Sequence, residues 1–252
     1  MIDAVRISVG NGSVARHFWE SALGLNFVDE GEVTDSALRE VWGIRHGTLR
    51  LTRLEIGPGV LPRLELLEWE GCSDKPIRDP RHPWDYGILA VRIPVSDLPA
   101  RLGQVAQWRC KVDRNGAEAC VTTPGGERVI LREGGEPAVI AVVPSIAGAK
   151  AFFHESLMLP NGIPVRAEKR FAGAASVDMV ETLRLGTLDV TEFRRSADPR
   201  PAGNTESRMN VGYTGYCMLS VSQTGLTTDR SLLVGPGGIP VERVLAVAPQ
   251  IL

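Results

Sequence analysis

Runs of alternating apolar and polar residues dominate the chain and predict a fold built mainly from strands. One face of such a strand packs on a core and the other faces outward, so apolar residues recur at every second position. Val14, Phe18 and Ala22 instead recur at every fourth position, which predicts a short amphipathic helix after the first strand. The strand-like runs around this helix are residues 5–9, 38–44, 48–54 and 64–69. Together they predict one β-α-β-β-β module.

The module recurs along the chain. Phe152-Phe153 repeat the adjacent aromatics of the first helix, and residues 188–193 match residues 64–69 position by position. Two shorter modules follow the two long ones in alternation, and the last module has no clear helix. An internal repeat of this length indicates a duplicated domain. We therefore expect two halves, residues 1–135 and 136–252, each with a long and a short module, the last one truncated.

Composition and charge exclude several classes of function. A formal net charge of −2 gives no electrostatic reason to bind nucleic acid or an anionic membrane. No apolar run approaches the roughly 18 residues of a membrane span, and the start of the chain has no signal-like segment. The four cysteines have irregular spacing and no Cys-x-x-Cys motif, which favours free thiols in a reducing compartment. We therefore expect a cytoplasmic protein.

Four short motifs occur in a fixed order between the predicted strands. They are Phe18-Trp19 with Leu23-Gly24-Leu25, Val95-Ser96-Asp97-Leu98, Pro124-Gly125-Gly126-Glu127-Arg128-Val129-Ile130-Leu131, and Phe152-Phe153 with Leu157. This series resembles the vicinal oxygen chelate superfamily, which includes glyoxalases, bleomycin-resistance proteins and extradiol dioxygenases. The resemblance implies an α+β fold of four βαβββ modules, arranged as two glyoxalase-like repeats. It also implies cupped mixed β-sheets with helices on the outside.

The resemblance further implies where a divalent metal would be held. The ligands in the family come from the first strand of each module, commonly His, and from its last strand, commonly Glu, and the metal stabilises an enolate or diolate. No histidine of this chain falls at these positions, so we expect no metal; a weak all-carboxylate site for Mg or Ca is the alternative. The first-strand positions are Ala4, Ala90, Ala138 and Tyr216, and the last-strand positions are Glu65, Ile130, Asp189 and Glu242.

Glu65 is the first candidate for acid–base chemistry. Glu65 and Glu68 lie on opposite faces of their strand, so one of them must face inward. In the functional interpretation, the inward acid is a buried carboxylate with a raised pKa that acts as a general base. In the structural interpretation, it forms an ion pair with Arg6, Arg50 or Arg92. The sequence does not decide between the two.

Further candidates lie on the other strands. Tyr216 beside Glu242 or Asp189 could hold or protonate a developing enolate oxygen, and the alternative is a tyrosine hydroxyl bonded at the edge of the sheet. Charged and aromatic side chains inside a cup would suit an anionic or phenolic ligand, and the alternative for the charged ones is a solvated strand face. The candidates for substrate binding are Trp42, His46, Arg50, Trp69, Arg92 and Asp189.

These residues suggest a metal-independent enzyme that acts on a small molecule. We expect an isomerase or lyase that removes a proton next to a carbonyl or phenol of a hydrophobic or aromatic substrate, with Glu65 or Glu242 as the base. Tyr216 or Arg50 would hold the oxyanion charge. The alternative is a non-catalytic protein that sequesters an aromatic ligand by stacking it on tryptophan or phenylalanine. An iron-dependent ring-cleaving dioxygenase is a third hypothesis, which the missing histidines disfavour.

The pairing of the modules decides which residues share a site. If modules one and four pair, Glu65, Tyr216 and Glu242 meet in one cavity, whereas pairing of modules one and two would separate them. The local pattern is compatible with both arrangements. A homodimer of the glyoxalase type is compatible with both leading functions, and so is a monomer that closes its cups within one chain.

Overall fold

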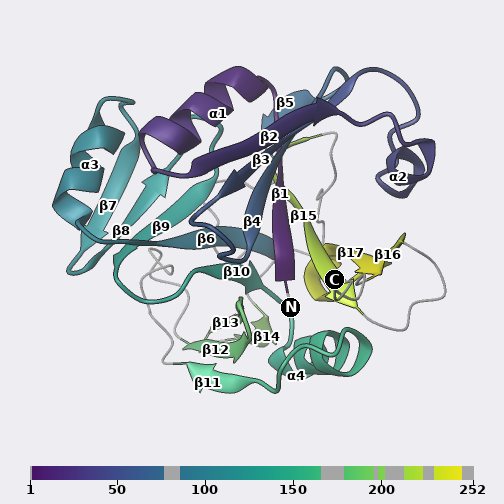
Figure 1. Cartoon of the computed structure of the whole chain (residues 1–252). Helices are drawn as coiled ribbons and strands as arrows, with labels where there is room; N and C mark the ends of the chain where they lie inside the picture. Colours follow the sequence, from purple (N-terminus) through teal and green to yellow (C-terminus); the bar gives the residue numbers. More distant parts are fainter. Residues whose placement is uncertain are drawn as a thin grey trace, which may run out of the picture.

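The computed structural model describes residues 2–76, 86–165, 179–195, 198–201, 213–223 and 230–245, and its strands form two large mixed sheets (Figure 1). The first sheet has the order β16 (Arg230–Val234), β17 (Pro240–Leu245), β15 (Tyr213–Gln223), β1 (Ile2–Val9), β4 (Arg63–Trp69), β3 (Leu49–Glu55) and β2 (Asn26–Glu32), with β5 (Ser73–Pro76) paired to β15. The second sheet has the order β11 (Ile163–Val165), β12 (Met179–Leu185), β13 (Leu188–Arg195), β10 (Ala138–Val142), β6 (Gly87–Val95), β9 (Arg128–Glu133), β8 (Glu118–Thr122) and β7 (Lys111–Asn115), with β14 (Asp198–Pro201) paired to β13.

Each sheet joins modules from both halves of the chain. Strand β1 pairs antiparallel with β15, which places modules one and four side by side in the first sheet. Strand β6 pairs antiparallel with β10, which does the same for modules two and three in the second sheet. The sheets therefore do not follow the predicted division into residues 1–135 and 136–252. The β1–β15 pairing is the arrangement that brings Glu65 and Glu242 into one cup.

Helices α1 (Gly12–Ser21) and α3 (Leu98–Ala106) lie side by side outside the sheets (Figure 1). The Asn11 side chain accepts a hydrogen bond from the N–H of Val14 and so begins α1, and Asp97 begins α3 in the same way. Phe18 of α1 contacts Trp108, just after α3, edge to face. The second aromatic segment forms α4 (Ile146–Lys150), which continues as a π-helical turn η1 (Ala151–Ser156).

Residues 38–44, predicted as a strand, instead form most of helix α2 (Ser36–Val41) and the turn after it. The Asp35 carboxylate caps this helix by accepting the N–H groups of Ala37 and Leu38. Strand β2 occupies the position in the sheet that was predicted for residues 38–44. All its residues are exposed, so its sequence does not alternate between apolar and polar residues. Helix α2 contacts β16 and stands apart from the other helices (Figure 1), so it is not part of the outer layer.

One apolar core lies between the two sheets and the outer helices. Leu64 and Leu66 of β4, Val91 of β6 and Phe18 of α1 are buried together in it, and each such side chain contributes about 1.5–3 kcal/mol on burial. Because strand residues alternate between faces, Glu65 and its equivalents point away from this core. A smaller apolar cluster, which includes Leu51 and Trp42, lies on that opposite face of the first sheet.

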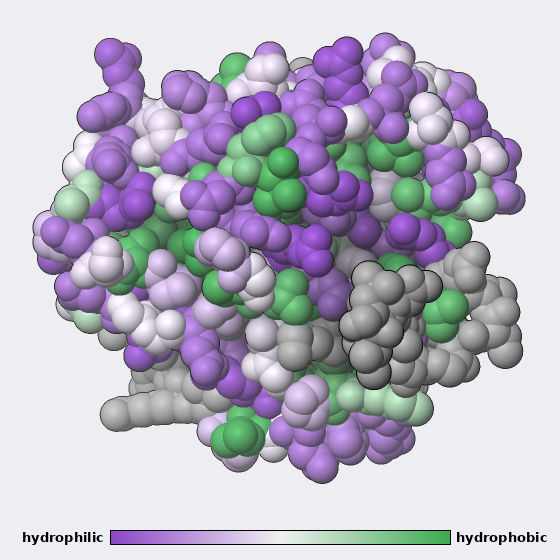
Figure 2. All heavy atoms as spheres, in the orientation of Figure 1, coloured by the Kyte–Doolittle hydropathy of each residue, from purple (hydrophilic) through white to green (hydrophobic). Residues whose placement is uncertain are grey.

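The surface carries no broad apolar area on the face drawn in Figure 2, where hydrophobic atoms form small separate groups among hydrophilic ones. Within the described segments, no helix is both long enough and apolar enough to cross a bilayer.

The last segment of module four contains the turn η3 (Pro236–Gly238), in which Gly237 and Gly238 have φ of +74°. That conformation favours glycine.

Candidate functional site

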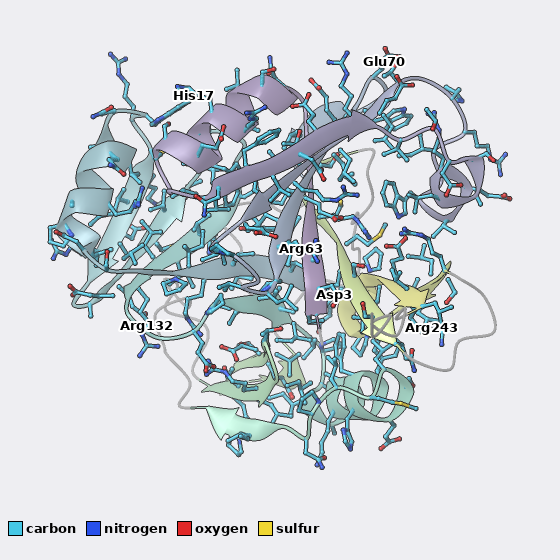
Figure 3. The ribbon with its side chains drawn as sticks, in the orientation of Figure 1. Asp3, His17, Arg63, Glu70, Arg132 and Arg243 are labelled. Carbon is cyan, nitrogen blue, oxygen red and sulfur yellow. The ribbon has the colours of Figure 1, made fainter. Side chains whose placement is uncertain are left out.

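The concave face of the first sheet forms a cavity of about 240 Å³ between the central strands and helix α2. Asp3 and Arg63 line it and lie near the N-terminal ends of the adjacent parallel strands β1 and β4 (Figure 3). Besides Arg6 and Glu65, the polar residues that line it are Asp3, Arg53, Arg63, Ser220, Ser222 and Arg230. The apolar residues are Ala4, Leu38, Trp42, Leu51 and Val244.

Arg6 lies at the centre of this cup and joins two carboxylates. Its Nε atom lies 2.8 Å from Glu65 Oε2 and its Nη1 atom 2.6 Å from Glu242 Oε2. Arg6 and both acids are buried, and Glu242 has no exposed surface. Burial opposes the charge of Arg6, but attraction to the two carboxylates outweighs it and raises the pKa of Arg6. The group is therefore a fixed buried cation.

The remaining carboxylate oxygens also have partners. Arg53 Nε donates to Glu65 Oε1 over 3.4 Å, and Arg230 Nη1 donates to Glu242 Oε1 over 3.1 Å. The Ser220 hydroxyl lies 3.4 Å from Glu242 Oε2. Glu65 is thus the inward acid of its strand, and its partner is Arg6, one of the three arginines considered from the sequence. Neither acid is therefore an isolated carboxylate in an apolar pocket.

Glu68, on the opposite face of the same strand, has a structural role. Its Oε1 atom accepts the N–H of Gly12, the first residue of α1, where a negative charge is favourable to the helix. Glu192 accepts the N–H of Ile146, the first residue of α4, in the same way. The sequence match between residues 64–69 and 188–193 therefore corresponds to a shared structural device.

Trp42 covers Arg6 from the side of α2. The guanidinium carbon lies 4.7 Å from the centre of the indole ring, a cation–π arrangement. Trp42 and Asp3 both line the cavity. The Trp42 Nε1 and Asp3 Oδ2 atoms are buried and have no hydrogen-bond partner among the described residues. One donor and one acceptor therefore remain for a ligand, since buried polar groups normally have partners.

These residues do not suit a divalent metal. Glu65 and Glu242 occupy the last-strand positions, but the Arg6 cation already lies between them. The neighbouring side chains are Ser220 and Met218 instead of imidazoles, and Met218 Sδ lies 3.4 Å from Arg6 Nη1. In the segments that the structure describes, no three His, Cys, Asp or Glu side chains gather in a way that could hold a metal.

The second sheet repeats part of this arrangement. Arg92 is paired with Ile130 across β6 and β9 as Arg6 is paired with Glu65 across β1 and β4. Its Nη1 atom lies 3.0 Å from Asp189 Oδ2. Arg184 also contacts Asp189, with Nε 2.7 Å from Oδ1. Arg92 and Asp189 therefore belong to a second arginine–carboxylate centre, which lacks the second acid because Ile130 replaces it.

Tyr216 is not brought together with the two acids of the cup. Its side chain lies in the core between the sheets, and its hydroxyl donates a 2.7 Å hydrogen bond to the Arg128 carbonyl of the second sheet. Burial, with a contribution from the nearby Glu127, raises the pKa of Tyr216 well above 10. The register of β15 against β1 shifts between Arg6 and Ile7, so Cys217 and Met218, but not Tyr216, join the cluster on the cup side.

The other predicted binding residues lie around one end of the cup. His46 and Arg50 are exposed, and Arg50 lies on the strand face opposite Leu49 and Leu51. Trp69 packs against the apolar cluster that contains Trp42, and its Nε1 atom donates to the His46 carbonyl over 3.0 Å. Of the substrate-binding set, Trp42 alone lines the cavity.

Sequence reasoning missed five polar residues of the cup. Asp3, Arg63, Ser220, Ser222 and Arg230 line the cavity but were not among the candidates. The available signal was the charged Arg6 within the apolar strand at residues 5–9, since a buried charge needs partners of opposite sign. That signal identifies a partner for Glu65, but it does not reveal the arginines on the neighbouring strands.

Comparison with known proteins supports the fold. No protein-family model matches the sequence, and no curated protein matches it. Among solved structures, glyoxalase I from Zea mays is similar with a TM-score of 0.64 and 13% identity, over 97% of this chain and 92% of that chain. A protein proposed to be a dioxygenase from Bacillus subtilis is similar with a TM-score of 0.63 and 13% identity, over 97% of this chain and 84% of that chain. The chain therefore shares the fold of glyoxalase I.

Proposed function

We propose that this chain binds a small organic molecule in the cup of the first sheet, and that it does so without a divalent metal. The observation that carries the proposal is Arg6, a buried cation held between Glu65 and Glu242 at the centre of the cup. Arg6 pairs with both acids, and Arg53 and Arg230 contribute further positive charge to Glu65 and Glu242 respectively. Arg6 also provides a fixed positive charge toward the cavity, where a carbonyl or phenolic oxygen of a ligand would be favoured.

The walls of the cup define the class of ligand. The unpartnered Trp42 Nε1 donor fits a carbonyl or phenolic oxygen, and the unpartnered Asp3 Oδ2 acceptor fits a hydroxyl or amino group. Leu38 and Leu51 provide apolar contacts, and Arg53 and Arg63 place positive charge at the rim. A cavity of about 240 Å³ has room for a small ring system. We therefore propose an aromatic or carbonyl-containing ligand.

The first test uses untagged protein purified without a chelator or a metal-affinity step. Elemental analysis should give far less than one equivalent of Fe, Mn, Ni or Zn per chain, and extraction followed by mass spectrometry should give an aromatic or carbonyl compound. Arg53→Gln should reduce the amount that co-purifies, and Arg50→Gln, on the same strand but facing away from the cup, should not. About one equivalent of bound metal would overturn the proposal.

A second candidate function is a metal-independent isomerase or lyase with Glu65 as the base. One contact favours it: Glu65 lines the cavity, and among the described residues its Oε1 atom accepts from Arg53 over 3.4 Å, which is long for a hydrogen bond. Glu242 does not line the cavity, so it is not the base in this proposal. Glu65 would remove a proton next to the carbonyl or phenol, and Arg6 would stabilise the resulting negative charge.

Solvent exchange separates the two functions. The ligand identified above is incubated with the protein in D₂O and followed by NMR. An enzyme of this kind should exchange or convert the substrate, and Glu65→Gln should abolish the exchange while the ligand remains bound. A wild-type protein that binds the ligand but leaves all its C–H bonds unexchanged would leave binding as the function.

A further inference from the structure

A second pocket lies at the junction of the two sheets, away from the cup. It has a volume of about 180 Å³ and is formed by the end of β1, the first turns of α1 and the turn between β8 and β9. Its walls are mainly apolar, with Val9, Val14, Ala15 and Phe18 on one side and Pro124 on the other. An engineered apolar cavity of about 150 Å³ binds benzene, so this pocket has the size for a single ring.

Glu127 places a carboxyl group in this apolar setting. It is 6% exposed, and its Oε2 atom accepts a hydrogen bond from the Thr123 hydroxyl, which in turn accepts the N–H of Glu127. Two backbone hydrogen bonds, Thr123 N to Glu127 O at 2.8 Å and Gly126 N to Thr123 O at 3.0 Å, close the same turn. The direction of the side chain is therefore fixed.

The turn provides no hydrogen-bond partner for the second carboxyl oxygen of Glu127. Glu127 Oε1 is buried and has no hydrogen-bond partner among the described residues, although locking the turn requires only Oε2. Gly125 keeps the space beside it open, because a Cβ at that position would lie 2.6 Å from Oε1. A buried polar atom without a partner costs free energy, and a ligand hydroxyl group would remove that cost.

The surroundings of Glu127 define the charge of the ligand. Burial raises the pKa of Glu127, and the hydrogen bond from Thr123 opposes this only in part. The same apolar setting disfavours a cation, because burying its charge costs free energy. No Lys, Arg or His is among the described residues that line the pocket, so an anion has no counter-charge. A neutral ligand remains.

We propose that this pocket binds a neutral, monocyclic aromatic molecule that carries one hydroxyl group, such as a simple phenol. The ring packs against Ala15, Phe18 and Pro124, and the hydroxyl group forms a hydrogen bond with Glu127 Oε1. This site shares no lining residue with the cup. The proposal can therefore be tested independently of the proposed function.

The test compares p-cresol with toluene, which differ only in the hydroxyl group. Both are titrated into the ¹⁵N-labelled full chain, and amide shifts are followed by NMR. Saturable shifts are expected for p-cresol at Val9, Val14, Thr123 and Gly125. Shifts that do not saturate, or that cluster around Arg6 and Trp42 in the cup, would overturn the proposal.

Variants at Glu127 test the hydrogen bond. Glu127→Leu should reduce the preference for p-cresol over toluene by roughly fivefold, the usual effect of one hydrogen bond, and Glu127→Gln should keep the preference. If Glu127→Leu does not fold, Gly125→Ala replaces it, because its Cβ displaces Oε1 and should reduce the same preference. An unchanged preference in the folded variant would show that Glu127 does not hold the hydroxyl group.

Discussion

At the scale of single residues, the buried charge of Arg6 is the feature on which the cup depends. Replacing Arg6 by Met keeps the length of the side chain but leaves Glu65 and Glu242 buried without their shared cation. Breaking a buried ion pair in this way costs about 3–5 kcal/mol, so we expect the free energy of unfolding to fall by that amount in urea denaturation. Lys111→Met removes an exposed pair with Asp113 and should change stability by less than about 1 kcal/mol. Equal stability of the wild type and Arg6→Met would contradict the central role of Arg6.

Glu127 makes a separate prediction about pH. Its pKa is raised by burial above the ordinary value of 4.5, so the folded state binds more protons than the unfolded state between these two pKa values. Stability from this group is therefore fully present below about pH 4.5 and is lost as the pH rises through the folded pKa. Glu127→Gln does not titrate. Urea denaturation between about pH 4.5 and pH 8 should show the Gln variant gaining stability relative to the wild type as the pH rises, and a constant difference would contradict the raised pKa.

At the scale of elements, the sequence predicts the strands and helices that have one face in the core and the other face in a polar environment. Strand β4 has this pattern, with Leu64 and Leu66 in the core and Glu65 facing the cup, and helix α1 follows its capping residue Asn11. Strand β2 was missed because it is exposed on both faces. Helix α2 was misassigned because its few residues alternate in polarity by chance. The capping residue Asp35 was the signal that could have identified it.

Tyr216 links the two sheets as a structural element. Its hydroxyl joins β15 of the first sheet to the Arg128 carbonyl of the second sheet, and Tyr216→Phe removes only that hydrogen bond. We expect the free energy of unfolding to fall by about 1 kcal/mol, with ligand binding in the cup unchanged. Thermal or urea unfolding and a ligand titration would measure the two quantities. A folded variant with lost turnover or binding would instead support the acid–base role that the sequence suggested for Tyr216.

At the scale of the whole molecule, the pairing of modules determines which residues share a site. This pairing cannot be inferred from local sequence patterns. Every module presents a first strand with similar alternation, so each could pair with any other. The site itself was only partly predictable for the same reason. Glu65 and Glu242 were identified from their strand positions, whereas Ser220 and Arg230 enter the cup only because β15 lies beside β1, with β17 and β16 next in the sheet.

This pairing makes a prediction about fragments. A chain divided between residues 135 and 136 is cut in the segment between β9 and β10, and each fragment then contains strands of both sheets. Residues 1–135 lack β15 beside β1 and β10 beside β6, which leaves apolar strand edges unpaired. We expect neither fragment to unfold cooperatively alone, and a mixture refolded together to form a one-to-one complex with a cooperative transition, as measured by light scattering and circular dichroism. The Arg6 centre gives the reason for this dependence, since Glu65 comes from one fragment and Glu242 from the other. A fragment 1–135 that folds as a stable monomer would show that modules one and two can close on each other without the second half of the chain.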